Sequence, residues 1–160
     1  MLTIEDGTII AGANSFTTDV ELLAYAAARG VTLPATEVDR DILQIKSIDY
    51  LFSKELSMAG CRINSTQTLP YPRFGVVLNG FQVAIDSIPQ NLKNAQMEAA
   101  IQAVSSPLLT NATINNVQRE KLDTLEIEYF DGGKWTNNQF DAINAYLRPL
   151  LKRTNTLARV

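Results

Sequence analysis

Residues 68–75 of this chain, Thr-Leu-Pro-Tyr-Pro-Arg-Phe-Gly, place two prolines, two aromatic residues, an arginine and a glycine close together. A proline fixes its own φ angle and disfavours helical geometry in the residue before it, so Leu69 and Tyr71 are expected to be extended. This proline segment therefore cannot be helical, and it must connect two helical halves of the chain. We assign a structural role, fixing the path of the chain, to Pro70, Tyr71, Pro72 and Arg73.

Four other segments carry helical signals. Asp19 and Glu21 follow several potential N-cap residues and predict a first helix from about Thr18 to Arg29, which Gly30 ends. Apolar residues at steps of three and four predict a longer helix at about 36–58, a central alanine-rich helix at about 89–104, and a last helix at 139–151. The residues expected to face the core are Val20, Leu23, Ala24 and Ala27, then Val38, Ile42, Ile45, Ile48, Leu51, Phe52 and Leu56, then Leu92, Ala95, Gln96, Ala99, Ala103 and Val104, and finally Phe140, Ile143, Leu147 and Leu150.

Two segments have the pattern of antiparallel β-hairpins. Asn79-Gly80 lies between two short apolar runs, which is a strong signal for a tight turn. Residues 125–130 alternate apolar and acidic side chains with period two and predict a second hairpin over about 113–130. In that hairpin Leu125, Ile127 and Tyr129 are expected to face the helices, and Glu126 and Glu128 to face outward opposite Arg119 and Lys121.

Together these elements predict a mainly α, α+β fold: a bundle of about four helices with an antiparallel β-hairpin and a basic C-terminal arm. The chain of 160 residues is long enough for one core and cramped for two. We therefore expect a single domain over residues 1–151 and an extended tail over residues 152–160.

Composition excludes several classes of site. The chain has no histidine and a single cysteine, which rules out Ser-His-Asp, Cys-His and the usual zinc sites. It also lacks the glycine motifs that bind phosphates and dinucleotides. We expect no enzyme activity, no cofactor and no catalytic or metal-binding residue, and we expect Cys61 to be buried or half-buried.

Charge and hydropathy limit the partners. No apolar run approaches the roughly 18 residues that span a bilayer, and residues 1–6 lack the basic start of a signal peptide, so we expect a cytosolic protein with no membrane partner. The formal net charge of −3 argues against a protein whose whole surface binds nucleic acid. Any contact with nucleic acid must therefore be local.

Two local clusters are candidates for such a contact. Tyr71, Arg73 and Phe74 combine aromatic and positive side chains, the pattern that binds single strands by stacking; the alternative is that both aromatics lie in the core and the arginine bonds backbone carbonyls. The last residues form a basic arm, either a frayed tail or a segment that docks on an acidic partner or on DNA phosphates. Its positive residues are Arg148, Lys152, Arg153 and Arg159.

Several motifs occur in order along the chain: Asn14-Ser15-Phe16, the proline segment, Ile88-Pro89, Arg119-Glu120-Lys121 leading into residues 125–129, and residues 147–151. In this order they resemble a family of small tailed-phage proteins labelled "DnaT-like single-stranded DNA-binding" and encoded among head and tail genes. Tyr71 stands where that family usually has tryptophan, and residues 122–124 lack the usual glycine.

The neighbouring genes of this family and its architecture resemble those of head-to-tail adaptors, which implies a structural protein of a bacteriophage virion. The implied protein forms a ring, expected to be dodecameric, under the portal, joins capsid to tail and continues the DNA channel. The implied partners are the portal protein, neighbouring copies of the chain, further tail or connector proteins, and DNA that passes without sequence-specific binding. The implied location is the head–tail interface of the virion, and the host cytoplasm during assembly.

This interpretation assigns portal binding to Arg148, Lys152, Arg153 and Arg159, and an inter-subunit or channel role to Arg119, Lys121, Glu126 and Glu128. The alternative hypothesis is a single-stranded-DNA-binding accessory protein that uses Tyr71, Arg73, Phe74 and the basic arm. Because the chain is acidic and lacks a basic aromatic platform, we prefer the adaptor interpretation.

Overall fold

The computed structural model describes residues 1–109, 119–122, 125–128 and 140–152, with backbone geometry alone for the two four-residue segments. The chain divides into two compact units, Met1–Leu108 with Phe140–Val160, and Leu109–Gln139. The elements of the first unit include helices α1 (Asp19–Ala27), α2 (Glu37–Ser53), α3 (Gln90–Ser105) and α4 (Asp141–Leu147), and the 3-10 turns η1 (Glu55–Ser57) and η2 (Arg148–Leu150). The predicted mainly α, α+β fold is confirmed.

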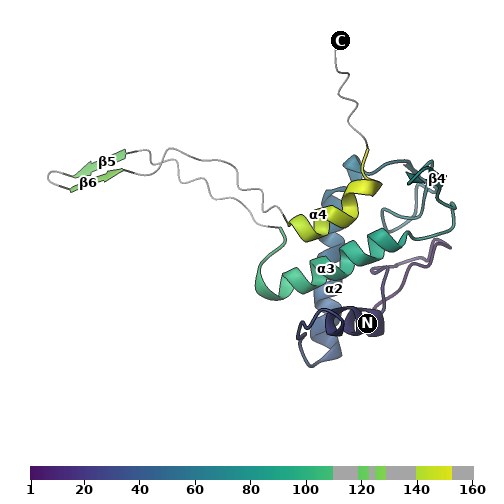
Figure 1. Cartoon of the computed structure of the whole chain (residues 1–160), viewed down its shortest axis with the longest axis horizontal. Coiled ribbons are helices and arrows are strands. Elements are labelled where there is room, and N and C mark those ends of the chain that lie inside the picture. The colour runs from purple at the N-terminus through teal and green to yellow at the C-terminus, as the bar shows by residue number, and fades with distance from the viewer. Residues whose placement is uncertain (110–118, 123–124, 129–139, 153–160) are drawn as a thin grey trace, which may run out of the picture. The chain divides into compact units, whose positions relative to one another are not determined.

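Helix α3 lies at the centre of the first unit, as its alanine-rich pattern predicted, and packs against α1, α2 and α4 (Figure 1). Leu92, Ala95 and Ala99 on its inner face are fully buried, and the small side chains let neighbouring helices approach closely. At the C-terminal end of α3 the buried face is shorter than predicted, because Val104 is exposed. The inward positions predicted for the last helix are confirmed for Ile143, Leu147 and Leu150.

Helix α1 begins as predicted, but it buries a different face. Thr18 and Glu21 form a reciprocal capping box at its start, and Gly30 adopts a φ of +67° beyond its end. Val20 and Leu23 are nevertheless exposed, and Ala24 and Ala27 with them, so the inner face predicted for this helix is wrong. The residues that pack inward are Leu22 and Ala26. Both stripes are equally apolar, so packing against α3 decides between them.

Helix α2 differs most from its prediction. It ends at Ser53 rather than near Met58, and η1 follows. Its buried face holds Ile48 and Leu51 as predicted, together with several polar side chains, whereas most of the predicted apolar stripe is exposed: Val38, Ile42, Ile45 and Leu56.

The physical reason is that most buried polar groups of α2 have partners within the fold, although the Gln44 Nε2 has none among the described residues. The Arg40 guanidinium bonds the Asp19 carboxylate, at 2.6 and 2.7 Å, and the carbonyl oxygens of Pro34 and Ala35. The Gln44 Oε1 accepts hydrogen bonds from the hydroxyls of Ser15 and Thr17. Because buried polar groups with partners cost little, these tertiary bonds, which periodicity does not reveal, set the orientation of the helix.

Two short antiparallel pairs complete the first unit: β1 (Cys61–Arg62) with β2 (Arg73–Phe74), and β3 (Val77–Leu78) with β4 (Phe81–Gln82). Asn79 and Gly80 have φ angles of 52° and 87°, so the predicted tight turn is confirmed, with the positive angles that suit a type I′ hairpin. Cys61 is an exposed free thiol, which corrects the expectation that it is buried.

The N-terminal loop is held by one buried carboxylate. Glu5 is 1% exposed and accepts hydrogen bonds from the backbone N–H groups of Gly7, Ile9 and Ile10, at 2.8–2.9 Å. These bonds hold Ile9 at a φ of 62°, a region that β-branched residues rarely adopt. Gly7, with a φ of 115°, lies directly against the Asp86 carbonyl.

The second unit contains the predicted hairpin. Strands β5 (Arg119–Leu122) and β6 (Leu125–Glu128) pair antiparallel, with Arg119 opposite Glu128 and Lys121 opposite Glu126, so the predicted register is confirmed. Residues 110–118, 123–124 and 129–139, which include Tyr129 and the outer parts of the predicted hairpin, lie outside the described residues. The orientation expected for Leu125 and Ile127 stays a prediction.

Candidate functional site

The proline segment is a structural core element. Tyr71 is fully buried, its bond to Pro72 is cis, and burial raises the pKa of its phenol to about 12. Arg73 is 6% exposed and donates from Nε to the Ala59 carbonyl and from Nη2 to the Gly60 carbonyl, both at 2.8 Å, as the alternative interpretation predicted. Phe74 is 52% exposed, so its predicted place in the core is wrong.

Three chain segments far apart in sequence meet beside Phe74. An added Cβ at Gly60 would lie 2.3 Å from the Phe74 carbonyl oxygen, which shows how closely these two segments approach. The Ala59 N–H donates to the Leu150 carbonyl at 2.8 Å. Strand β3 also packs against η2. The β3–β4 hairpin, the end of the proline segment and the end of α4 therefore form one end of the first unit, where Figure 1 labels β4.

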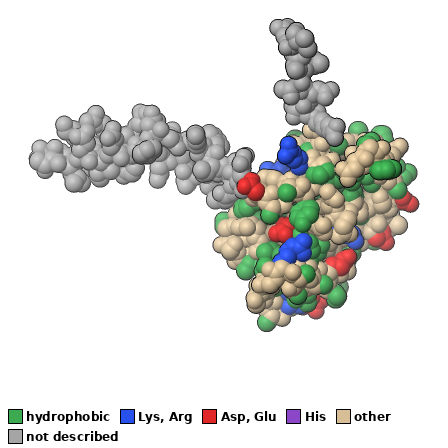
Figure 2. Space-filling model, viewed as in Figure 1, with side chains coloured by type: hydrophobic (Ala, Val, Ile, Leu, Met, Phe, Trp, Pro, Cys, Tyr) green, Lys and Arg blue, Asp and Glu red, His purple; other side chains and the backbone are tan. Residues whose placement is uncertain are grey.

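Large apolar side chains are exposed at this end. Phe81, on β4, is 79% exposed, and Val77, on β3, is 58% exposed. Figure 2 shows hydrophobic side chains, in green, gathered at the same end of the unit. The register pairs Phe81 with Leu78 and Val77 with Gln82, so Phe81 and Val77 lie on opposite faces of the hairpin. The exposed aromatic residues Phe81 and Phe74 offer flat contact area to a partner.

Two positive residues lie in η2, which packs against β3, or shortly after it. Arg148, in η2, is exposed. Lys152 is exposed as well, and it is tied down by bonds from its backbone N–H to the Ser57 carbonyl and from Nζ to the Leu56 carbonyl, at 2.8 and 2.9 Å. Neither takes part in an ion pair between described residues. We call Phe74, Phe81, Arg148 and Lys152 the β3–β4 surface.

Several other arginines of the first unit are committed to carboxylates. Arg62 pairs with Glu55 at 2.5 Å, and this hydrogen bond holds the pKa of the Glu55 carboxyl below its usual value. Arg40 pairs with Asp19 at 2.6 Å and Arg29 with Glu98 at 3.3 Å. Arg148 and Lys152 differ from these arginines, because neither pairs with a carboxylate among the described residues.

The structure places the functional residues predicted from the sequence in different parts of the chain. Of the portal-binding set, Arg148 and Lys152 lie on the β3–β4 surface, while Arg153 and Arg159 lie outside the described residues. Arg119, Lys121, Glu126 and Glu128 are placed in the second unit by their backbone alone. Sequence reasoning missed Phe81, although its position directly after the Asn79-Gly80 turn, at the tip of a two-residue strand, favours exposure.

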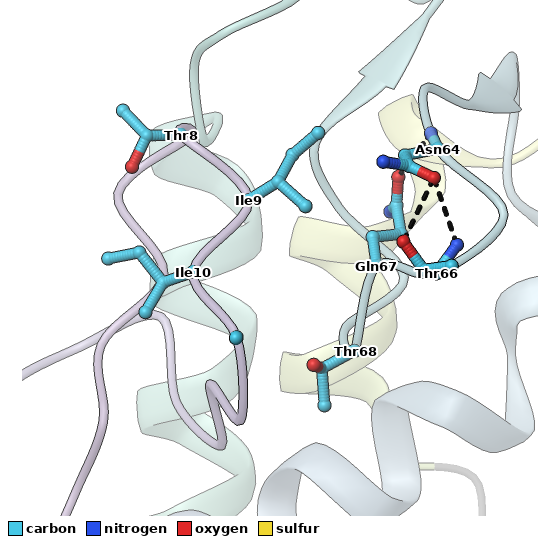
Figure 3. Close-up of a pocket in the computed structure, with 8 residues that line it drawn as sticks. Thr8, Ile9, Ile10, Asn64, Thr66, Gln67 and Thr68 are labelled. Atoms are coloured by element: carbon cyan, nitrogen blue, oxygen red, sulfur yellow. Dashed lines mark hydrogen bonds between the residues drawn. The ribbon is translucent and has the colours of Figure 1, made fainter.

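A concave region lies on the first unit, between the N-terminal loop and the loop after β1 (Figure 3). It has a volume of about 350 Å³ and is lined by residues 8–11 on one side and by Asn64 and residues 66–68 on the other. The Asn64 Oδ1 is occupied by the N–H and hydroxyl of Thr66, both at 3.0 Å. No lining side chain is charged, so this groove is poorly suited to phosphate.

Within the described residues, no group of three or more cysteine, aspartate or glutamate side chains is arranged to hold a metal ion. In the same part of the chain, no helix combines the length and apolar character needed to cross a bilayer.

Comparison with known proteins gives one match. The family described as "Putative DnaT-like ssDNA binding protein" matches residues 1–160. No curated protein and no solved structure matches the chain.

This match corrects the preferred interpretation of the sequence. The family's description names single-stranded-DNA binding and gives no support for a head-to-tail adaptor, a virion component or a portal-binding protein. The adaptor prediction is therefore wrong, and the portal and ring partners that it implied are unsupported. The match favours the alternative hypothesis, although two of the side chains assigned to DNA there, Tyr71 and Arg73, are buried.

Proposed function

Because the chain belongs to the family described as "Putative DnaT-like ssDNA binding protein", we propose that it binds single-stranded DNA and does so through the β3–β4 surface. The observation that carries the proposal is the exposure of Phe81 on the β3–β4 hairpin, whose strand β3 packs against η2. Arg148, in η2, makes no ion pair with the described residues. An exposed aromatic ring and a cation on two packed elements suit a nucleotide strand, which presents bases to the ring and phosphates to the cation.

The aromatic residues supply contacts that do not depend on sequence. Every base has a π face, and stacking on an exposed aromatic side chain contributes about 1–3 kcal/mol per base. Phe81 and Phe74 expose 79% and 52% of their surface in the free protein, so neither has to leave the core to stack. The contacts that hold β2 and β3–β4 in place support a preformed platform, which lowers the ordering cost of binding.

The cations supply the contacts to phosphate. Arg148 follows α4 directly and lies in η2, which packs against β3, and Lys152 comes two residues after η2. Binding phosphates at these positions releases counterions and makes the affinity depend on salt. A local cationic surface also accounts for DNA binding by a protein whose formal net charge is −3, because the remaining acidic surface repels DNA from other orientations.

We predict that Phe81→Ala weakens binding to a labelled oligothymidine by about 1–3 kcal/mol, roughly 5- to 150-fold in Kd, because a stacking partner is lost. Fluorescence anisotropy at fixed salt measures this change. Phe81→Trp is expected to keep the affinity and Phe81→Leu to lose it, since leucine is apolar but has no π face.

Val20→Ala is the matched control, because Val20 is 74% exposed but lies on α1. It is expected to leave the Kd unchanged. If Phe81→Ala and Phe74→Ala both bind DNA as the wild type does, the β3–β4 surface is not the binding site, even if the protein binds DNA. If the wild type itself does not bind, the proposed function is wrong.

A further inference from the structure

The outer face of α2 carries a row of three exposed β-branched residues. Val38 is 68% exposed, Ile42 44% and Ile45 37%. Their spacing of four and three residues places them in one line along the helix. The opposite face is turned to the core and buries Gln44 and Leu51. We call Val38, Ile42 and Ile45 the α2 stripe.

An exposed stripe of this kind calls for an explanation. β-branched residues are weaker helix formers than the straight-chain polar residues that an outer helix face usually carries, so they cost helix stability here. Contiguous apolar surface on a monomer is also uncommon and marks interaction sites. The α2 stripe therefore has the properties of a surface that another chain covers.

The charges beside the stripe indicate which chain. Asp39 and Lys46 are both exposed and are seven residues apart, two turns of the helix, so they lie on the same flank of the stripe. At about 1.5 Å of rise per residue they are roughly 10 Å apart, too far to pair with each other. No ion pair between described residues includes Lys46.

We propose that the α2 stripe is the interface of a twofold-symmetric dimer of this chain, in which two α2 helices pack antiparallel with Ile42 at the axis. In such a pair, a residue a given number of positions after Ile42 lies opposite the residue of the partner subunit that is the same number of positions before Ile42. Val38 then packs near Ile45 of the partner subunit, and Ile42 against Ile42 of the partner subunit. The apolar row is therefore complementary to itself.

The same twofold rotation brings Lys46 and Asp39 of the two subunits together. A twofold axis keeps the same flank of both helices on the same side, so Lys46, four residues after Ile42, lies beside Asp39 of the partner subunit, three residues before its Ile42. Two symmetric ion pairs result. Asp49, on the line of the stripe, lies opposite the N-terminal end of the partner's α2, where a negative charge is favourable. The apolar row and the pair of charges are both centred on Ile42. Binding to a different protein would not require this symmetry.

The test is the mass of the full chain in solution, measured by light scattering after size exclusion at about 100 μM, a concentration high enough to populate a weak dimer. The wild type is expected at twice the 17.6 kDa of one chain, and Ile42→Glu at 17.6 kDa. Ile42 is partly exposed, so this variant is expected to keep its helical circular dichroism. Val20→Glu, on the exposed face of α1, is the control and is expected to remain dimeric.

A charge swap tests the symmetry itself. Lys46→Glu is expected to weaken the dimer by about tenfold or more, because two attractive pairs become repulsive. Asp39→Lys combined with Lys46→Glu is expected to restore dimerisation relative to either single variant. A wild-type monomer at this concentration, a dimer unaffected by Ile42→Glu, or a charge swap that fails to restore the dimer would each overturn the proposal.

Discussion

Replacing Arg73 by alanine is expected to lower the free energy of unfolding by about 3–5 kcal/mol, because it removes a buried charge from its partners. The guanidinium donates hydrogen bonds to the Ala59 and Gly60 carbonyls at 2.8 Å and to the Pro70 carbonyl at 3.3 Å. It also lies 3.5 Å from the Glu55 carboxylate. Each carbonyl would lose its donor, and the side chain would leave a cavity beneath the proline segment. Urea denaturation measures the change.

Arg62→Ala is the matched control. Arg62 also bonds Glu55, but about a third of its side chain is exposed, so water replaces part of what is lost. We expect a cost of about 1 kcal/mol for Arg62→Ala, in the range of surface ion pairs. Arg73→Lys is expected to recover only part of the stability, because the three donors of an ammonium group share one nitrogen, whereas Arg73 bonds the three carbonyls from three different nitrogens. Equal losses for Arg62→Ala and Arg73→Ala would contradict this account of the proline segment.

Gly7→Ala is expected to cost about 2–4 kcal/mol, through backbone strain and overlap together. A Cβ at this position would lie 1.9 Å from the Asp86 carbonyl oxygen, and the φ of 115° is one that alanine rarely adopts. The Asp86 backbone cannot move aside as the end of a flexible side chain could. Thermal denaturation followed by circular dichroism measures the loss.

Gly12→Ala separates the two causes. Gly12 also has a positive φ, of 73°, but no heavy atom lies within 4 Å of the position of its Cβ. It is therefore expected to lose only about 1 kcal/mol, the cost of a left-handed conformation without overlap. If Gly7→Ala were no more destabilising than Gly12→Ala, the close packing of the N-terminal loop on the Asp86 carbonyl would be wrong.

The sequence predicts where the first two helices and the Asn79-Gly80 turn begin better than which way the helices face. The caps at Thr18 and Thr36 and the Asn79-Gly80 turn are local, because each depends on residues within three positions of itself. The register of β5 with β6 likewise follows from an alternating pattern.

The face of a helix depends instead on partners far along the chain. Gln44 is buried because Ser15 and Thr17 donate to it, and Arg40 because Asp19 accepts from it. These bonds turn Val38 and Ile42 outward, which the periodicity of α2 alone does not predict. The candidate site has the same origin: the hairpin that carries Phe81 and the turn that carries Arg148 are about 70 positions apart in sequence and come together because β3 packs on η2.

The measurement that tests the central claim most directly is the salt dependence of binding between the wild-type protein and an oligothymidine. The affinity is expected to fall as salt rises, with a linear relation between the logarithms of the binding constant and the salt concentration. Arg148→Gln combined with Lys152→Gln is expected to reduce that slope by about 1.4, because each phosphate contact on a single strand contributes about 0.7. Absence of binding at low salt, or a slope unchanged by the double variant, would contradict the account.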